Sequence, residues 1–296
     1  MIPFVRQSEV EYGRCERLSP LVRRVVAHNP GPFTYTGTGT YLVGSGEVAV
    51  IDPGPLDEVH LGALLKALEG ERVTRILITH SHLDHSPLAA ALQQATGAVV
   101  YGRSAAAAHT PSGPRTEEGS QTLFRPDVEV EEGQPIAGPG WTFEPILTPG
   151  HASNHVAYAL AEEQALFSGD HVMGWSTTVV SPPDGVMGDY LRSLDKVRAR
   201  TFATLWPTHG PAIADPGPFL DAYKAHRLDR EEQILGQLRA GRTQISEIVP
   251  VLYAAVDQRL WPAAAQSVLA HLAHLVETGR ASADGPPDLD RRYGLA

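Results

Sequence analysis

The chain has little cysteine, little lysine and no long apolar segment. Cys15 is the only cysteine among 296 residues, which excludes a disulfide framework and a cysteine-rich zinc site. No stretch approaches the ~18 consecutive apolar residues of a transmembrane helix. The N-terminal segment, residues 1–7, also lacks the apolar run of a signal peptide. These absences predict a cytoplasmic protein with no membrane partner.

Positive charge is scarce as well. Lys and Arg number 24 against 34 Asp and Glu, for a net charge of −10. Residues 211–296 alone hold nine basic and eleven acidic side chains. A protein that coats nucleic acid needs a basic face, so the composition argues against that class. Histidine is abundant instead, with 13 residues.

The length allows one large domain and a smaller one. Strand and helix patterns alternate up to residue 210, which is typical of an α/β fold. Strands are expected at 40–44, 48–52, 75–79, 98–101, 141–147, 156–160, 165–169 and 203–206, and helices at 57–69, 86–95 and 190–200. Residues 105–134 are expected to form a long irregular loop. Helices at 219–238, 245–256 and 262–278 with a terminal hairpin then predict a winged-helix-like module. The predicted domains are residues 1–215 and 216–296.

The histidines gather at predicted strand ends. The segment Thr79-His80-Ser81-His82-Leu83-Asp84-His85 lies between a strand and a helix, where α/β proteins place their chemistry. Further candidate ligands follow other strands in the same way, namely His151, Asp170 and His209. Imidazole nitrogens and carboxylate oxygens are ligands that zinc accepts. One short loop can therefore supply ligands to two adjacent metal ions.

These residues, with the turn Ile51-Asp52-Pro53-Gly54, resemble the metallo-β-lactamase fold superfamily over residues 35–210. The resemblance implies a four-layer αββα sandwich and two Zn²⁺ ions, with Fe or Mn as alternatives. It implies that one metal is held by His80, His82 and His151, and the other by Asp84, His85 and His209. Asp170 would bridge both metals, and Asp84 would orient a bridging hydroxide as the catalytic carboxylate.

Further features indicate which branch of the superfamily the chain resembles. Histidine stands where some lactamases use cysteine, which favours the glyoxalase II or ribonuclease branch. The segment 169–185 and the C-terminal helices resemble the lactamase-beta-2-like group, which includes an endoribonuclease for single-stranded RNA. We therefore expect a hydrolase for an ester, thioester, lactone or phosphodiester, with that endoribonuclease as the alternative. Glyoxalase II, β-lactamase, diiron oxidoreductase and non-catalytic metal-scaffold activities are less favoured.

Other residues receive secondary roles. The expected substrate contacts are Trp175, Thr177, His226 and Arg227, with a small molecule as the main partner and RNA as the alternative. Asp52 is expected to hydrogen-bond the metal loops, and His155 to be structural. The C-terminal module is expected to cap the site, so that truncation after about Asp215 leaves the metal ligands in place and damages substrate binding more than metal content. Formation of a homodimer and docking of DNA or RNA are the other interpretations of this module.

Overall fold

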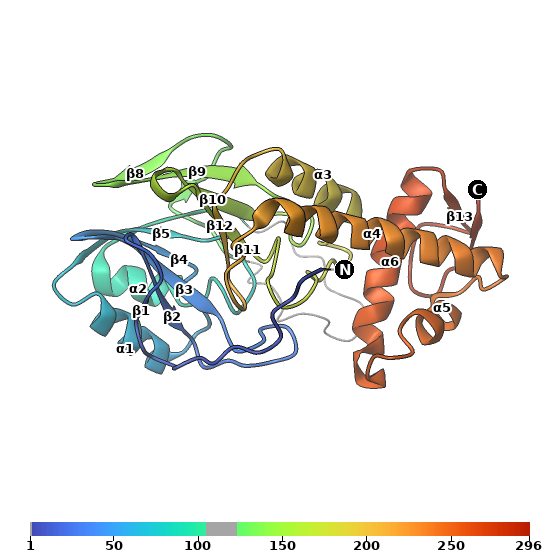
Figure 1. Ribbon diagram of the computed structural model, residues 1–296, viewed down its shortest axis with the longest axis horizontal. Coiled ribbons are helices and arrows are strands. Elements are labelled where there is room, and N and C mark those ends of the chain that lie inside the picture. The colour runs from blue at the N-terminus through green and yellow to red at the C-terminus, as the bar shows by residue number, and fades with distance from the viewer. Residues whose placement is uncertain (1, 105–122) are drawn as a thin grey trace.

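Two β-sheets pack face to face in the computed structural model, which describes residues 2–104 and 123–296 (Figure 1). The first sheet has the order β1(Glu16–Arg17), β2(Val22–Val26), β3(Gly39–Ser45), β4(Glu47–Ile51), β5(Arg72–Leu77), β6(Val99–Gly102), β7(Val128–Glu129). The second has the order β12(Thr204–Pro207), β11(Ala165–Gly169), β10(Val156–Leu160), β9(Trp141–Leu147), β8(Ile136–Gly138). Parallel pairs occur in both, β4 with β5 and β11 with β12.

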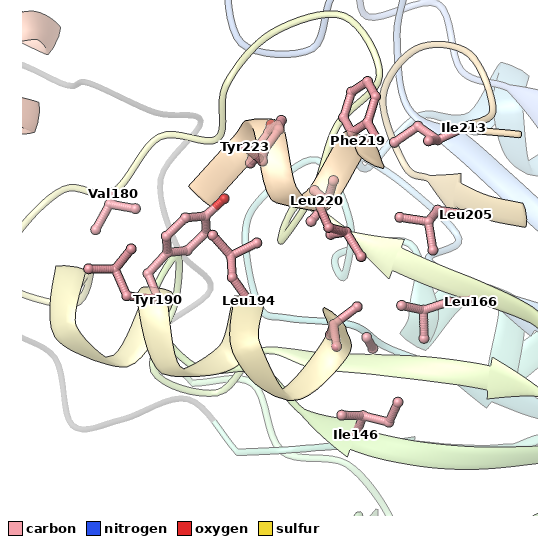
Figure 2. Packing of buried hydrophobic residues seen from close by; sticks show 14 of the residues in the cluster. Ile146, Leu166, Val180, Tyr190, Leu194, Leu205, Ile213, Phe219, Leu220 and Tyr223 are labelled. Carbon is pink, nitrogen blue, oxygen red and sulfur yellow. The ribbon is translucent and has the colours of Figure 1, made fainter. Parts of the chain in front are cut away.

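Helices cover the outer faces of both sheets. Helices α1(Glu58–Ala67) and α2(Ala89–Thr96) pack on the first sheet, and α3(Met187–Arg198) and α4(Pro216–Arg239) on the second (Figures 1 and 2). Between the sheets lies a separate cluster of buried side chains that includes Tyr41, Ile51, Trp141, Phe143 and Phe167. Each sheet thus buries both faces, and the predicted four-layer αββα sandwich is confirmed.

The segments that lead into α1 and α2 begin these two helices in different ways. Asp57 caps α1 by accepting the Val59 amide at 2.8 Å. Helix α2 begins at Ala89, three residues later than expected. The preceding amides of Ser86 and Leu88 bond instead to His82 and Gly54. The segment before α2 therefore joins the histidine loop to the Asp52-Pro53-Gly54 turn.

The C-terminal module contains α5(Ile245–Leu252), α6(Trp261–Glu277) and the hairpin β13(Ala281–Ala283)–β14(Tyr293–Leu295). Its own core includes Leu238, Ile248, Val268, Leu272 and Tyr293. The described residues also contain the 3₁₀ turns η1(Ala161–Glu163) and η2(Gln258–Leu260). The predicted winged-helix-like architecture is confirmed. The expected extension of α5 to residue 256 is wrong, since the helix ends at Leu252 and the Val256 amide bonds to Tyr253 O in a turn.

Helix α4 belongs to two cores. Its first half places Phe219, Leu220 and Tyr223 in the cluster of the second sheet and α3 (Figure 2). Its second half places Ile234 and Leu238 in the core of the C-terminal module. The domain boundary near residue 215 stays a prediction, but this helix joins the two parts through packed side chains.

Three further points concern the sequence expectations. Most of the expected loop 105–134 lies outside the described residues, and its later part contains β7 and runs up to β8. Strand β2 was not expected, because Arg23 and Arg24 interrupt its apolar pattern; they pair with Glu71 and Glu16. Within the described ranges, no helix is both long and apolar enough to cross a membrane.

Candidate metal centre

The predicted ligands meet at one edge of the sandwich. The histidine loop follows β5, His151 follows β9, Asp170 follows β11 and His209 follows β12. Strands of both sheets end at this edge, so loops distant in sequence converge there. All seven predicted ligands are buried, with exposed fractions between 0 and 7 %.

Three imidazoles form the first group. The Nδ1 atom of His82 lies 2.9 Å from Nε2 of His80 and 3.1 Å from Nε2 of His151. Two nitrogens bound tetrahedrally to one zinc ion at ~2.0–2.1 Å lie roughly 3.3 Å apart. The three nitrogens therefore converge with nearly the separation that a single metal ion needs.

Asp84, His85 and His209 form a second group. Oδ2 of Asp84 lies 3.0 Å from Nε2 of His209 and 3.3 Å from Nε2 of His85. Asp170 lies between the groups, since its Oδ2 is 3.4 Å from His209, 3.6 Å from His85 and 3.8 Å from His151, each distance taken to Nε2. One carboxylate thus faces histidines of both groups.

Two buried atoms lack the partner that a metal ion would provide. Nε2 of His85 and Oδ1 of Asp170 are buried without a hydrogen-bond partner. The opposite ring nitrogens are engaged, because Nδ1 of His151 contacts Val179 O at 2.6 Å and Nδ1 of His209 contacts Gly37 O at 3.2 Å. Such bonds fix the tautomer that leaves the Nε2 lone pair for a metal. The donor set therefore fits two borderline-soft divalent ions.

The electrostatics of the centre favour bound cations. Burial would lower the pKa of His209, but the facing carboxylates of Asp170 and Asp84 raise it to about 10. Burial would raise the pKa of Asp84, yet His85 and His209 hold it well below its usual range. By contrast, burial and the neighbouring histidines hold the pKa of His80 well below its usual range. The carboxylates thus stay charged and demand a positive partner, which imidazolium or a metal ion can supply.

Asp52 joins three of the loops. Its carboxylate accepts the Thr79 amide at 2.8 Å and the Thr79 hydroxyl at 2.7 Å. It also accepts from Nδ1 of His85 at 2.9 Å and from the Thr208 hydroxyl at 3.1 Å. Asp52 itself is fully buried and has a left-handed φ of 47°. The hydrogen-bonding role expected for it is therefore present, with side-chain partners as well as a backbone amide.

The predicted substrate residues lie in different environments. Trp175 and Thr177 are half-buried in the loop after Asp170, and Trp175 stacks on Tyr35 at 4.8 Å. His226 is half-buried on α4. Arg227 is only 3 % exposed and donates to the carbonyl of Thr178. Its guanidinium is therefore engaged with the protein interior rather than presented at the surface.

His155 supports the backbone of Asp170. Its Nε2 accepts the Asp170 amide at 3.2 Å, and its Nδ1 contacts the Thr148 hydroxyl at 2.8 Å. Burial and the nearby histidines hold the pKa of His155 well below its usual range, so the ring stays neutral. This is the satisfied, structural histidine that the sequence suggested.

Threonines and one tyrosine complete the supporting contacts, and sequence reasoning did not find them. Thr79 and Thr208 each precede a histidine and donate to Asp52. The repeated Thr-His pair was the available signal. Thr178 bonds to Asp170 O at 2.8 Å, and Tyr223 holds the same loop. Nothing in the local sequence of α4 signals the second contact.

Known proteins resemble this chain over most of its length. The profile of the metallo-beta-lactamase superfamily matches residues 36–209, and that of the beta-lactamase associated winged helix domain matches residues 245–288. A "Beta-lactamase-like protein 2 homolog" of Caenorhabditis elegans is 34 % identical over 76 % of this chain and 73 % of its own. An "Atrochrysone carboxyl ACP thioesterase" of Aspergillus chevalieri is 34 % identical over 77 % of this chain and 68 % of its own.

A solved structure extends the likeness to both parts of the fold. A metallo-beta-lactamase family protein of Thermus thermophilus superposes with a TM-score of 0.76 at 25 % identity, covering 95 % of this chain and 100 % of its own. The profile matches, the sequence identities and the histidine–aspartate cluster agree. The chain belongs to the metallo-beta-lactamase superfamily and is a hydrolase of that fold with a histidine–aspartate metal-binding site.

Proposed function

We propose that the protein is a dinuclear metal-dependent hydrolase, with zinc as its metal and iron or manganese as alternatives. His80, His82 and His151 would hold one ion, and Asp84, His85 and His209 the other, with Asp170 shared. The observation that carries this proposal is the convergence of seven buried ligand side chains from four strand ends, with Asp170 facing both groups.

The bound metals would activate water at neutral pH and polarise the oxygen of the scissile group. The remaining tasks fall to side chains. Asp84 lies against His85 and His209, which keep its carboxylate ionised. An ionised carboxylate there can orient the attacking water by accepting a hydrogen bond from it. Asp52, through His85 and the two threonines, holds these groups in position.

Thioesters are the substrate class we place first. The thioesterase of Aspergillus chevalieri covers 77 % of this chain at 34 % identity, so hydrolysis of a thioester is compatible with a closely similar fold. Esters and lactones require the same attack on a carbonyl carbon and are the next candidates.

Cleavage of single-stranded RNA is the alternative. The resemblance to the lactamase-beta-2-like group favours it, and the same metal apparatus serves a phosphodiester. Each phosphate contact needs a cation, and the excess of acidic over basic side chains in residues 211–296 argues against a strong RNA-binding surface.

Metal analysis and a substrate panel test the proposal together. We expect close to two zinc ions per chain in protein purified without added metal. The panel comprises S-lactoylglutathione, an acyl-pantetheine thioester, a lactone, bis(p-nitrophenyl) phosphate, single-stranded RNA and nitrocefin. We expect turnover of a thioester or ester that a chelator abolishes and Zn²⁺ restores, with little or no turnover of nitrocefin.

The matched variants are Asp84→Asn and Asp127→Asn. Asp127 is a carboxylate near β7 that bonds to Gln93 and Val100, away from the cluster. We expect only the first change to abolish turnover. Metal-free protein with full activity, or exclusive hydrolysis of the β-lactam, would overturn the proposal.

A further inference from the structure

The loop after Asp170 has no helix or strand between residues 171 and 180, yet half or more of its side chains are buried. A buried loop must satisfy its backbone groups with partners from elsewhere in the protein. Side chains of α3 and α4 supply several of those partners, and Val5, His151 and Ser168 supply others. The loop is therefore shaped by the helices that cover the second sheet.

Tyr223 of α4 makes the largest number of these contacts. Its hydroxyl accepts the amides of Met173 at 3.2 Å and Thr178 at 3.0 Å, and donates to Ser176 O at 2.6 Å. The side chain is fully buried, and burial raises the pKa of Tyr223 well above its usual range. The hydroxyl therefore stays protonated and can always donate to Ser176.

Two more side chains hold the same loop. The Tyr190 hydroxyl of α3 donates to His171 O at 2.8 Å, and the Arg227 guanidinium of α4 donates to Thr178 O. Arg227 also lies 5.1 Å over the ring of Tyr190. Figure 2 shows Tyr190 on α3 and Tyr223 on α4 within the same buried cluster.

The loop contacts the metal cluster at two points. The Thr178 hydroxyl donates to the carbonyl of Asp170 at 2.8 Å. The next carbonyl, Val179 O, lies 2.6 Å from Nδ1 of His151 and fixes the ring tautomer that directs Nε2 to the cluster. Hydrogen bonds thus run from Tyr223 to Thr178, and from there to Asp170 and, one residue on, to His151.

We propose that Tyr223 is a positioning residue through which α4 sets the geometry of Asp170 and His151, so that the affinity for metal depends on a helix whose second half belongs to the core of the C-terminal module. Helix α4 lies between the segments 36–209 and 245–288 that the two family profiles match. The inference rests on the proposed metal centre and deepens it, since it names what holds two of its ligands in place.

Metal affinity of Tyr223→Phe tests the inference. The change removes one hydroxyl and leaves the ring in its packing. We expect the affinity for Zn²⁺, measured by competition with a chromophoric chelator, to fall 10- to 100-fold, the range typical of lost outer-shell contacts. We also expect an altered visible spectrum of the Co²⁺-loaded protein. Tyr253→Phe is the matched control, because Tyr253 stacks under Arg230 in the C-terminal module.

A second pair of variants keeps the test decisive if Tyr223→Phe does not fold. Thr178→Val removes the hydroxyl that reaches Asp170, and Thr178→Ser retains it. We expect Thr178→Val to weaken Zn²⁺ binding, and we expect Thr178→Ser to bind Zn²⁺ as tightly as the unaltered protein.

Two failures are distinguishable. If the unaltered protein binds no divalent metal, the proposed function fails. If it binds two ions and folded Tyr223→Phe or Thr178→Val binds them equally well, with an unchanged Co²⁺ spectrum, only the role of Tyr223 is refuted. Lower thermal stability of the metal-free variant with unchanged metal affinity would refute it too, since that is the result of a purely structural role.

Discussion

Asp52→Asn is the change that most sharply tests how the metal loops are held. Four donors converge on this carboxylate from Thr79, His85 and Thr208, at 2.7–3.1 Å. Asparagine has the same shape and tolerates the left-handed backbone at φ 47°. The substitution therefore changes charge and hydrogen bonding while leaving the turn intact.

The magnitude follows from which donors can adapt. Oδ1 of asparagine still accepts the Thr79 amide, and the threonine hydroxyls can rotate to accept from the new NH₂ group. Nδ1–H of His85 cannot. Either that donor stays buried without a partner, which costs ~1–3 kcal/mol, or the ring changes tautomer and protonates the Nε2 atom that faces Asp84 and Asp170.

We expect either outcome at His85 to lower the affinity for metal. A 10- to 100-fold rise in the Kd for Zn²⁺ corresponds to about 1.4–2.8 kcal/mol. Competition with a chelator measures the Kd, and thermal unfolding of the metal-free protein measures the cost to folding.

The control is Asp57→Asn, which removes the same charge five residues along the chain. Asp57 caps α1, and asparagine caps helices as well as aspartate does. We expect this variant to match the unaltered protein. If Asp52→Asn keeps the same Kd within twofold and the same unfolding temperature, the reasoning about His85 is wrong.

Three further predictions concern the metal centre, the C-terminal module and acid stability. Asp170→Asn should lower the affinity for both metals, because its carboxylate faces histidines of both groups; elemental analysis showing full metal content would contradict this. Truncation after Asp215 should lower metal affinity as well as substrate binding, since it removes Tyr223. That revises the sequence expectation, and chelator competition on the truncated chain checks it. Burial lowers the pKa of His60 to about 4, whereas the unfolded chain binds that proton near pH ~6.5. The contribution of neutral His60 to the free energy of unfolding is therefore complete above pH ~6.5. It falls by at most ~3 kcal/mol as the pH falls towards 4. The free energy of unfolding, measured with denaturant at several pH values, should fall less steeply with falling pH in His60→Gln than in the unaltered protein. Equal slopes for the two proteins would refute the assignment.

The sequence by itself determined the alternation of strands and helices and the candidate ligands. Apolar runs such as Val48–Ile51 and Ile76–Ile78 indicate buried strands. Core packing does not account for histidines that follow such strands, so they were predicted to be metal ligands. Because strand ends of an α/β fold meet at one edge, the positions of His80, His151 and His209 after predicted strands were enough to bring them to one site. Their assignment to two metal ions came from the family resemblance. Strand β2 was not predicted, since its charged residues Arg23 and Arg24 interrupt the apolar pattern and their partners Glu71 and Glu16 are known only from the structure.

The tertiary structure alone decided how those ligands are supported. The hydroxyl of Tyr223 reaches a loop some 45 residues earlier in the chain, and no local pattern encodes such a contact. Arg227 was expected to contact the substrate, yet it is buried, where its guanidinium donates a hydrogen bond to Thr178 O and lies over the ring of Tyr190. Helical periodicity predicts which side chains share a face, but the partner of that face depends on how distant elements pack, and for α4 the partners are two different cores.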